Sequence, residues 1–138
     1  MDPRLPTAEH ILAKILENRY KVKVGICKFD DDGLLEVYSE VDLREVDPKE
    51  LEEEVNEVIS KNLVVKKYVL PRQEAEKVVD LWKVPSSVTE IRIVEIGDFD
   101  KRPCKDEHVD NTSDIGRIRI KSVERVGKDR YRFLFQVE

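Results

Sequence analysis

Histidine, cysteine and tryptophan are scarce in this sequence of 138 residues. It contains two cysteines, Cys27 and Cys104, two histidines, His10 and His108, and one tryptophan. The two cysteines could pair only by a coincidence of geometry, so a disulfide framework is not expected. The sequence shows neither a signal peptide nor an apolar run near the roughly 18 residues of a membrane-spanning helix. We therefore expect a reduced, cytoplasmic protein without a membrane partner.

Charge is abundant but unevenly distributed. The chain has 25 basic and 30 acidic residues, for a formal net charge of −5. This balance argues against a general nucleic-acid binder, because phosphate contacts need clustered Lys and Arg. Residues 40–57 contain nine acidic and two basic side chains, whereas residues 117–132 contain seven basic and two acidic ones. The basic stretch suits a tRNA backbone, but it equally suits the solvent face of an ordinary sheet.

The periodicity of apolar residues predicts a single α+β domain covering residues 1–138. Helical spacing and capping residues, Asp2-Pro3 or Thr7 for the first helix and Asp47 for the second, predict one helix that ends near residue 18 and two more over 47–61 and 72–81. Alternating apolar residues and turn signals predict strands over 21–29, 34–41, 63–70, 88–96, 117–126 and 130–137. We expect a mixed, mostly antiparallel sheet packed against helices.

A long loop, residues 97–116, follows one of these strands and carries a Cys and a His four residues apart. Cys104 and His108 suit zinc, and His10 would join them if the two ends of the chain pack together. Three protein ligands with one open position are typical of a catalytic zinc site. The spacing alone fits equally a core cysteine beside a surface histidine.

Two segments resemble the motifs of a known family. Residues 7–12 (Thr-Ala-Glu-His-Ile-Leu) resemble the later part of the motif H-T-A-x-H-L-L. Residues 96–100 and 104–116 resemble the region of the motif C-G-G-T-H-V-x-N-T-G-E-I-G. Both motifs belong to the editing domain shared by alanyl- and threonyl-tRNA synthetases and by the free-standing AlaX proteins. The resemblance implies the fold of that domain and hydrolysis of the ester bond of mischarged tRNA. Its typical substrates are Ser- or Gly-tRNA(Ala), with Ser-tRNA(Thr) for the threonyl type.

The resemblance also implies a set of site residues. In AlaX-type proteins, two histidines of the first motif and the Cys and His of the second hold zinc. His10, Cys104 and His108 match three of these positions, and the fourth is Pro6, which offers no donor. The resemblance further implies substrate-binding roles for Asn111 and Thr112.

The chemistry of the site stays open between two mechanisms. In the first, His10, Cys104 and His108 hold zinc, with Asp106 or Glu107 as a possible additional ligand. In the second, no metal binds and His10 or His108 positions a water. The sequence between Cys104 and His108 is Lys-Asp-Glu, where the family motif has Gly-Gly-Thr, so the backbone approaches a ligand less easily here.

A relative that has lost turnover is the alternative. Such a protein would act as a tRNA- or protein-binding module that kept the fold. In either case an acidic chain without an evident tRNA-binding appendage suggests a homodimer or another subunit to grip tRNA.

Overall fold

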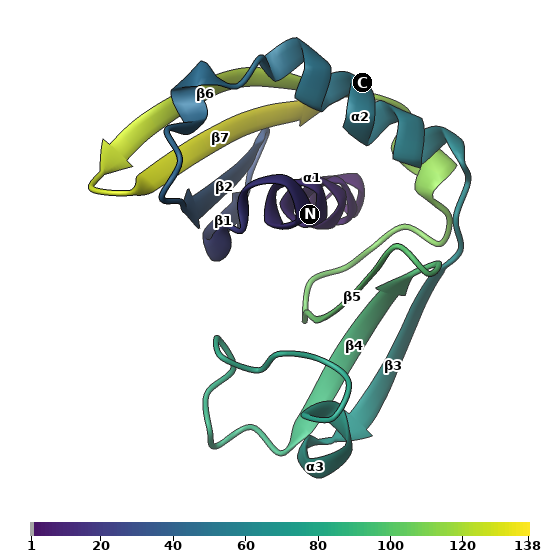
Figure 1. The fold of residues 1–138 in the computed structure, drawn as a ribbon. Helices are drawn as coiled ribbons and strands as arrows, with labels where there is room; N and C mark the ends of the chain where they lie inside the picture. Colours follow the sequence, from purple (N-terminus) through teal and green to yellow (C-terminus); the bar gives the residue numbers. More distant parts are fainter. Residues whose placement is uncertain (1) are drawn as a thin grey trace.

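A computed structural model describes residues 2–138, and their elements follow one another as in Figure 1. The helices are α1 (Arg4–Tyr20), α2 (Pro48–Ser60) and the short α3 (Arg72–Ala75), with 3-10 turns η1 (Leu43–Glu45) and η2 (Thr112–Ile115). The strands are β1 (Lys23–Phe29), β2 (Gly33–Tyr38), β3 (Val65–Pro71), β4 (Glu90–Ile96), β5 (Asp100–Pro103), β6 (Ile118–Gly127) and β7 (Arg130–Val137). None of the described helices is long and apolar enough to cross a membrane.

The strands form two sheets, and every pairing in them is antiparallel. One sheet has the order β1-β2-β7-β6 and the other has the order β3-β4-β5. The predicted α+β class is confirmed, but the strands are divided between two sheets rather than joined in one mixed sheet. Strands β3, β4 and β5 pair only with one another, with β4 in the middle.

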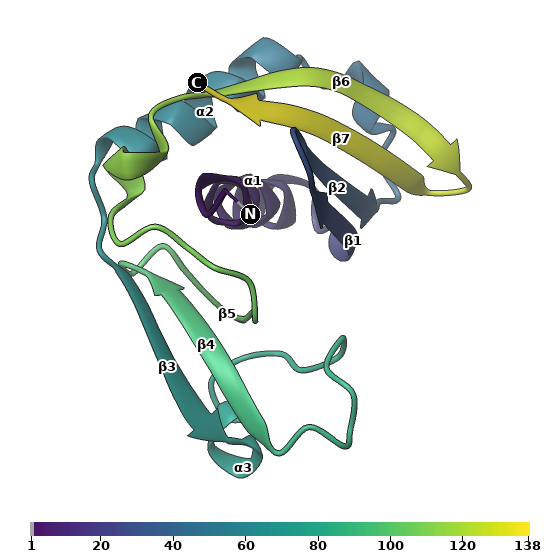
Figure 2. The ribbon, with the colours of Figure 1, turned by 180° about the vertical axis from the view of Figure 1, so that it is seen from behind.

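Helix α1 is the centre of the main core. The four-stranded sheet curves around it, and the three-stranded sheet lies on its other side (Figures 1 and 2). Its apolar stripe is fully buried against the aromatic side chains of β7, which include Phe133 and Phe135. Gly33 permits this packing, because a Cβ there would lie only 2.2 Å from the ring of Phe135.

The first turn of α1 agrees with the first of the two predicted starts, at Asp2-Pro3. The helix begins at Arg4 after Pro3, so Thr7 lies inside the helix and does not cap it. The Thr7 hydroxyl donates instead to the carbonyl of Pro3 at 2.9 Å. This places Thr7 one turn into the helix, where its hydroxyl meets the loop that carries His108.

Helix α2 covers the edge of the larger sheet. Its predicted cap is present, because the Asp47 carboxylate accepts from the backbone N–H of Lys49. On its inner side Asn56 bonds both the N–H and the carbonyl of Ile118, at 2.8 and 3.1 Å. These bonds satisfy backbone groups of β6 that would otherwise be an exposed sheet edge.

Two predictions of regular structure were wrong. The helix predicted over 72–81 ends at Ala75, and residues 76–89 continue as turns and coil. The loop predicted over 97–116 contains β5 and η2, which its polar sequence does not indicate. Contacts with β4 accompany α3 and β5, and contacts with α1 and α2 accompany η2, so tertiary packing outweighed local preference in both places.

Candidate metal centre

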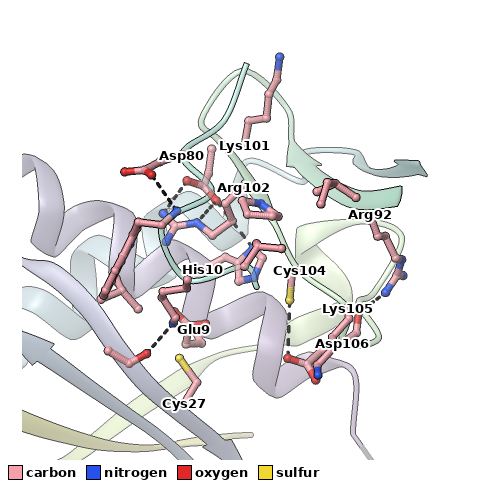
Figure 3. A pocket seen from close by; sticks show the side chains of 18 of the residues that line it. Glu9, His10, Cys27, Asp80, Arg92, Lys101, Arg102, Cys104, Lys105 and Asp106 are labelled. Atoms are coloured by element: carbon pink, nitrogen blue, oxygen red, sulfur yellow. Dashed lines mark hydrogen bonds and ion pairs between the residues drawn. The ribbon is translucent and has the colours of Figure 1, made fainter. Parts of the chain in front are cut away.

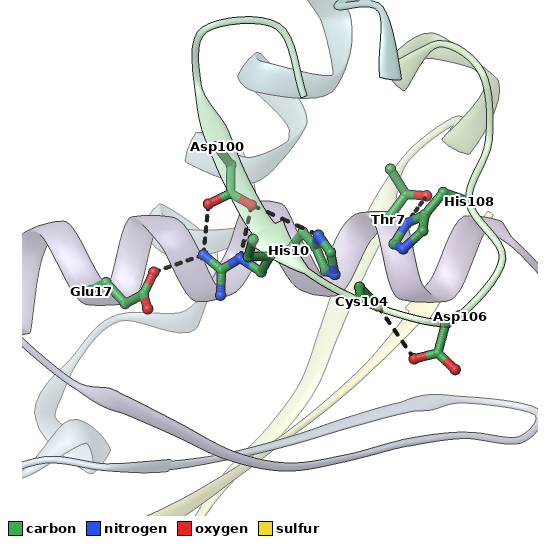
Figure 4. A network of polar contacts seen from close by, with 8 residues as sticks. Thr7, His10, Glu17, Asp100, Cys104, Asp106 and His108 are labelled. Carbon is green, nitrogen blue, oxygen red and sulfur yellow. Dashed lines mark hydrogen bonds and ion pairs between the residues drawn. The ribbon is translucent and has the colours of Figure 1, made fainter. Parts of the chain in front are cut away.

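The structure brings His10, Cys104 and His108 together. His10 lies on α1, Cys104 directly follows β5, and His108 lies on the loop after it. One donor atom from each residue lies within 4.8 Å of the others (Figure 4). The two imidazole rings meet edge to face, with centroids 4.5 Å apart. Helix α1 and the segment after β5 therefore bring together three side chains that each offer a metal-donor atom, as the sequence suggested.

Thr7 fixes the orientation of His108. The Thr7 hydroxyl donates to Pro3 and accepts from the N–H of Val109, and it lies 3.1 Å from Nδ1 of His108. Since its single proton is directed to Pro3, Nδ1 of His108 acts as the donor in that contact. The proton then sits on Nδ1, and the lone pair of Nε2 is free. Nε2 is buried and has no hydrogen-bond partner in the described structure, which is the state that a metal ligand requires.

A carboxylate stands behind His10. Oδ2 of Asp100 lies 3.7 Å from Nδ1 of His10, and both side chains are buried. Arg102 holds Asp100 by two bonds, of 2.8 and 2.7 Å, and also binds Glu17 at 2.7 Å (Figure 4). At 3.7 Å, Oδ2 of Asp100 and Nδ1 of His10 do not form a hydrogen bond, and this nitrogen has no hydrogen-bond partner in the described structure. A carboxylate that does bond the second nitrogen of a metal-binding imidazole is the usual means of orienting it, and Asp100 is the carboxylate placed to do so. Sequence analysis missed this chain of contacts, although Asp100 lies in the stretch that carries the family resemblance.

Burial sets the protonation of the three donors. It lowers the pKa of His108 to about 4, and it lowers the pKa of His10 well below its usual value. Both imidazoles are therefore neutral at pH 7, as metal ligands must be. Burial raises the pKa of the Cys104 thiol to about 12, and Oδ2 of Asp106 lies 3.6 Å from its sulfur. A bound cation would favour the thiolate, which is the form that coordinates.

The fourth position of the family pattern is closed to metal. Pro6 is buried in the first turn of α1, four residues before His10 and so on the same face of the helix. Proline is tolerated there because the first N–H groups of a helix have no partner within the helix. Of the two carboxylates considered from the sequence, Asp106 lies beside Cys104, whereas Glu107 is exposed. The three donors fit zinc in residue type and protonation, and they leave a coordination position open.

Two members of the cluster, His10 and Cys104, lie at a large cleft. The cleft has a volume of about 1160 Å³ and is lined by α1, β1, β4, β5 and the segment 76–89, with His10 and Cys104 in its wall (Figure 3). Glu9 also lines it and is buried, and its Oε2 has no hydrogen-bond partner. Burial raises the pKa of Glu9 to about 7. Sequence analysis passed over Glu9, because it occupies the variable position of the first motif.

Asn111 and Thr112 have structural contacts. The Thr112 hydroxyl donates to the carbonyl of Ile59 and accepts from the N–H of Leu63. Asn111 begins η2 and forms a capping box with Asp114. Neither residue is among those that line the cleft. Their substrate-binding role stays a prediction.

Comparisons with known proteins agree with this geometry. The family described as the second additional domain of threonyl and alanyl tRNA synthetase matches residues 91–133. The chain is 35% identical over 127 residues to an alanine–tRNA ligase of Saccharolobus islandicus, covering 87% of this chain and 14% of the ligase. It is 35% identical to the alanyl-tRNA editing protein AlaX-L of Pyrococcus horikoshii, covering 96% of this chain and 33% of that protein. It is 33% identical to the alanyl-tRNA editing protein AlaX-M of Saccharolobus solfataricus, covering 98% of this chain and 58% of that protein.

An α+β fold with two buried histidines and a partly buried cysteine clustered beside a cleft defines a candidate metal-binding domain. The motif resemblance and the comparisons narrow this class. The chain matches the editing-domain family of alanyl- and threonyl-tRNA synthetases over residues 91–133, and it is similar over nearly its whole length to two alanyl-tRNA editing proteins. It spans less than two thirds of the length of each of these relatives.

Proposed function

We propose that this protein is a trans-editing deacylase that hydrolyses the ester bond of mischarged tRNA, with Ser- or Gly-tRNA(Ala) as substrate. The observation that carries the proposal is the cluster of His10, Cys104 and His108, two of which, His10 and Cys104, lie in the wall of a cleft of about 1160 Å³. Two similar proteins are named alanyl-tRNA editing proteins, which supports this substrate class.

His10, Cys104 and His108 would hold a zinc ion in this proposal. When bound, zinc supplies Lewis-acid chemistry, by polarising an ester carbonyl or by acidifying a water. The surrounding residues fix the donors: Thr7 directs Nε2 of His108 into the site, and Asp100 stands behind His10. The apolar surroundings that keep both histidines neutral would also strengthen electrostatic interactions with the developing oxyanion.

A metal-free mechanism places the two histidines in a direct catalytic role. The unpartnered Nε2 of His108 is neutral at pH 7, so it can accept a hydrogen bond from a water. His10 would position that water from the other side of the ring pair. The two mechanisms differ in their response to a chelator.

Deacylation assays test the proposal. The substrates are Ser-, Gly- and Ala-charged tRNA(Ala) and Ser-charged tRNA(Thr), each with added zinc and with chelator. We expect hydrolysis of a mischarged species that His108→Ala and Cys104→Ala abolish. Cys27→Ala is the matched control, because Cys27 is the second thiol of the chain and does not belong to the cluster of His10, Cys104 and His108.

The outcomes separate the alternatives. Loss of hydrolysis with chelator, restored by zinc, would support the metal mechanism, and resistance to chelator would support the water mechanism. No hydrolysis of any of the four species by the folded, zinc-loaded protein would contradict the deacylase. That result would favour a non-catalytic tRNA- or protein-binding module.

A homodimer that grips tRNA is part of this proposal. The chain carries a formal net charge of −5, so one copy offers a modest field for binding a polyanion. Light scattering on the free protein and on its mixture with tRNA would show whether two copies act together. The mass of one chain in the free protein, together with one chain per tRNA in the mixture, would contradict the dimer.

A further inference from the structure

The segment 76–89 bridges the two sheets at the cleft. It lies between α3 and β4, and its coil extends beneath β1 (Figures 1 and 2). On its own sheet, the Arg72 guanidinium donates to the carbonyls of Pro85 and Val88, at 2.9 and 2.7 Å. On the other sheet, Nζ of Lys83 donates to the carbonyl of Gly25 at 2.5 Å. The segment is therefore fixed on both sides of the cleft.

Exposed apolar side chains gather around this cleft. Eight large apolar residues of the described chain are exposed, and four of them line the cleft: Ile26, Tyr38, Trp82 and Val88. As whole residues, Trp82 is 49% exposed and Tyr38 is 44% exposed. Exposed apolar surface concentrated at one concave site, rather than scattered, marks an interaction site.

Lysines without an acidic partner in the described structure also line this cleft. Lys14, Lys23 and Lys105 line the same cleft, and within residues 2–138 none of them has a carboxylate within ion-pair distance. Nζ of Lys23 lies 4.2 Å from the centroid of the Trp82 ring, which holds the indole by a cation–π contact. Aromatic platforms next to lysines that can contact phosphates are the features with which proteins bind single-stranded nucleic acid.

We infer that Trp82 is the platform on which the base of the 3′-terminal adenosine of tRNA stacks, with the cleft lysines contacting the phosphates of the single-stranded end. The inference rests on the proposed function, because the aminoacyl ester sits on the ribose of that nucleotide and would reach His10 and Cys104 in the same cleft. The Lys23 ammonium occupies part of the indole, and the exposed part of the ring is available to a base.

Fluorescence of the protein tests this directly, because Trp82 is its only tryptophan. Uncharged RNA hairpins with a single-stranded CCA end are titrated in, together with matched hairpins whose last residue lacks the base. We expect the complete end to quench Trp82 emission. Binding to labelled RNA, followed by anisotropy, should weaken about 5- to 150-fold in Trp82→Ala, with most of the affinity kept in Trp82→Phe.

Two controls make the test specific to stacking. Removing the terminal base should cost the wild type about the same factor and should cost Trp82→Ala nothing further. Val69→Ala, which alters an exposed apolar side chain outside the cleft, should bind like the wild type. The wild-type comparison of the two hairpins needs no variant, so the test does not depend on the folding of Trp82→Ala.

Equal affinity of the wild type for the two hairpins would overturn the inference, as would binding without quenching of Trp82. Either result would favour a protein, rather than RNA, as the partner of the exposed rings of Tyr38 and Trp82. The assay uses uncharged RNA and no metal, so it is independent of hydrolysis. Stacking without deacylation would contradict the proposed activity alone, and deacylation without stacking would contradict this inference alone.

Discussion

The protonation of the donors predicts how metal affinity depends on pH. The pKa of Cys104 is raised to about 12, so the metal-free site holds a thiol at neutral pH, whereas coordination needs the thiolate. The pKa of His108 is lowered to about 4, and that of His10 lies well below its usual value. Both imidazoles are therefore already neutral and need not release a proton to bind a metal. Metal binding should therefore displace about one proton, from Cys104, and affinity should rise about tenfold per pH unit near pH 8.

Glu9 adds a second effect at lower pH. Its pKa is raised to about 7, so below that pH the metal-free site also holds a protonated carboxyl group beside the cleft. A bound dication would favour its ionisation, and the release should approach about two protons per metal near pH 6. Glu9→Gln should restore a release of about one proton at that pH.

Zinc titrations against a chelating dye between about pH 6 and pH 8.5 measure the slope, and calorimetry in buffers of different ionisation enthalpy counts the protons. Cys27→Ala should behave like the wild type, and Cys104→Ala should lose both affinity and slope near pH 8. Affinity that is independent of pH near pH 8 would refute the assignment of Cys104 as a ligand. A release of about three protons would refute the neutral state of the histidines.

Three substitutions test the contacts around the donors. Thr7→Val removes the hydroxyl that accepts from Nδ1 of His108. It should lower metal affinity about 10- to 100-fold in chelator competition, whereas Thr7→Ser should retain the affinity of the wild type. Asp100→Asn removes one carboxylate partner of the largely buried Arg102 guanidinium. It should reduce the free energy of unfolding, measured with urea, by about 3 kcal/mol. Pro6→His places a fourth donor one turn before His10, and it should raise metal affinity where Pro6→Ala does not. An unchanged value in any of these measurements would contradict the corresponding contact.

The sequence predicted the elements whose signals are local. Helix α2 begins at Pro48 after the Asp47 cap and buries the predicted stripe, because capping box, proline and apolar spacing all favour the same helix. The hairpin of β6 and β7 likewise turns at the predicted residues, with Tyr131, Phe133 and Phe135 facing the core. Agreement between local signals is what made these parts predictable.

Residues 76–89 show where that approach fails. The spacing of Ala75, Val78 and Val79 resembles a helical stripe, and Ala75 is indeed buried. In the structure, however, Val79 packs on Ile91 and Ile93 from a turn rather than from a helix, and Val78 is exposed. The spacing of apolar residues predicts which of them are buried. Contacts with β4, however, determine the backbone conformation in which they are buried.

The donor cluster was predictable in composition but not in its support. His10, Cys104 and His108 are recognisable because Cys and His are rare in this chain and fall in ordered motifs. The contacts of Thr7 and Asp100 were not predictable, because Thr and Asp have many ordinary uses in caps and ion pairs. Their roles follow only from distances between residues about 90 to 100 positions apart in the sequence.

The loss of one donor at Pro6 is compatible with hydrolysis. A site that closes all four positions with protein ligands holds its metal for structure, whereas a catalytic zinc keeps a position for water or substrate. Here the two histidines lie beside buried contacts that do not involve Pro6, since Thr7 bonds the loop of His108 and Arg102 bonds the Asp100 carboxylate behind His10. The missing histidine therefore removes a ligand without disturbing the orientation of the others. The open position is then adjacent to the cleft in whose wall His10 and Cys104 lie, which is where an ester substrate of the proposed enzyme would bind.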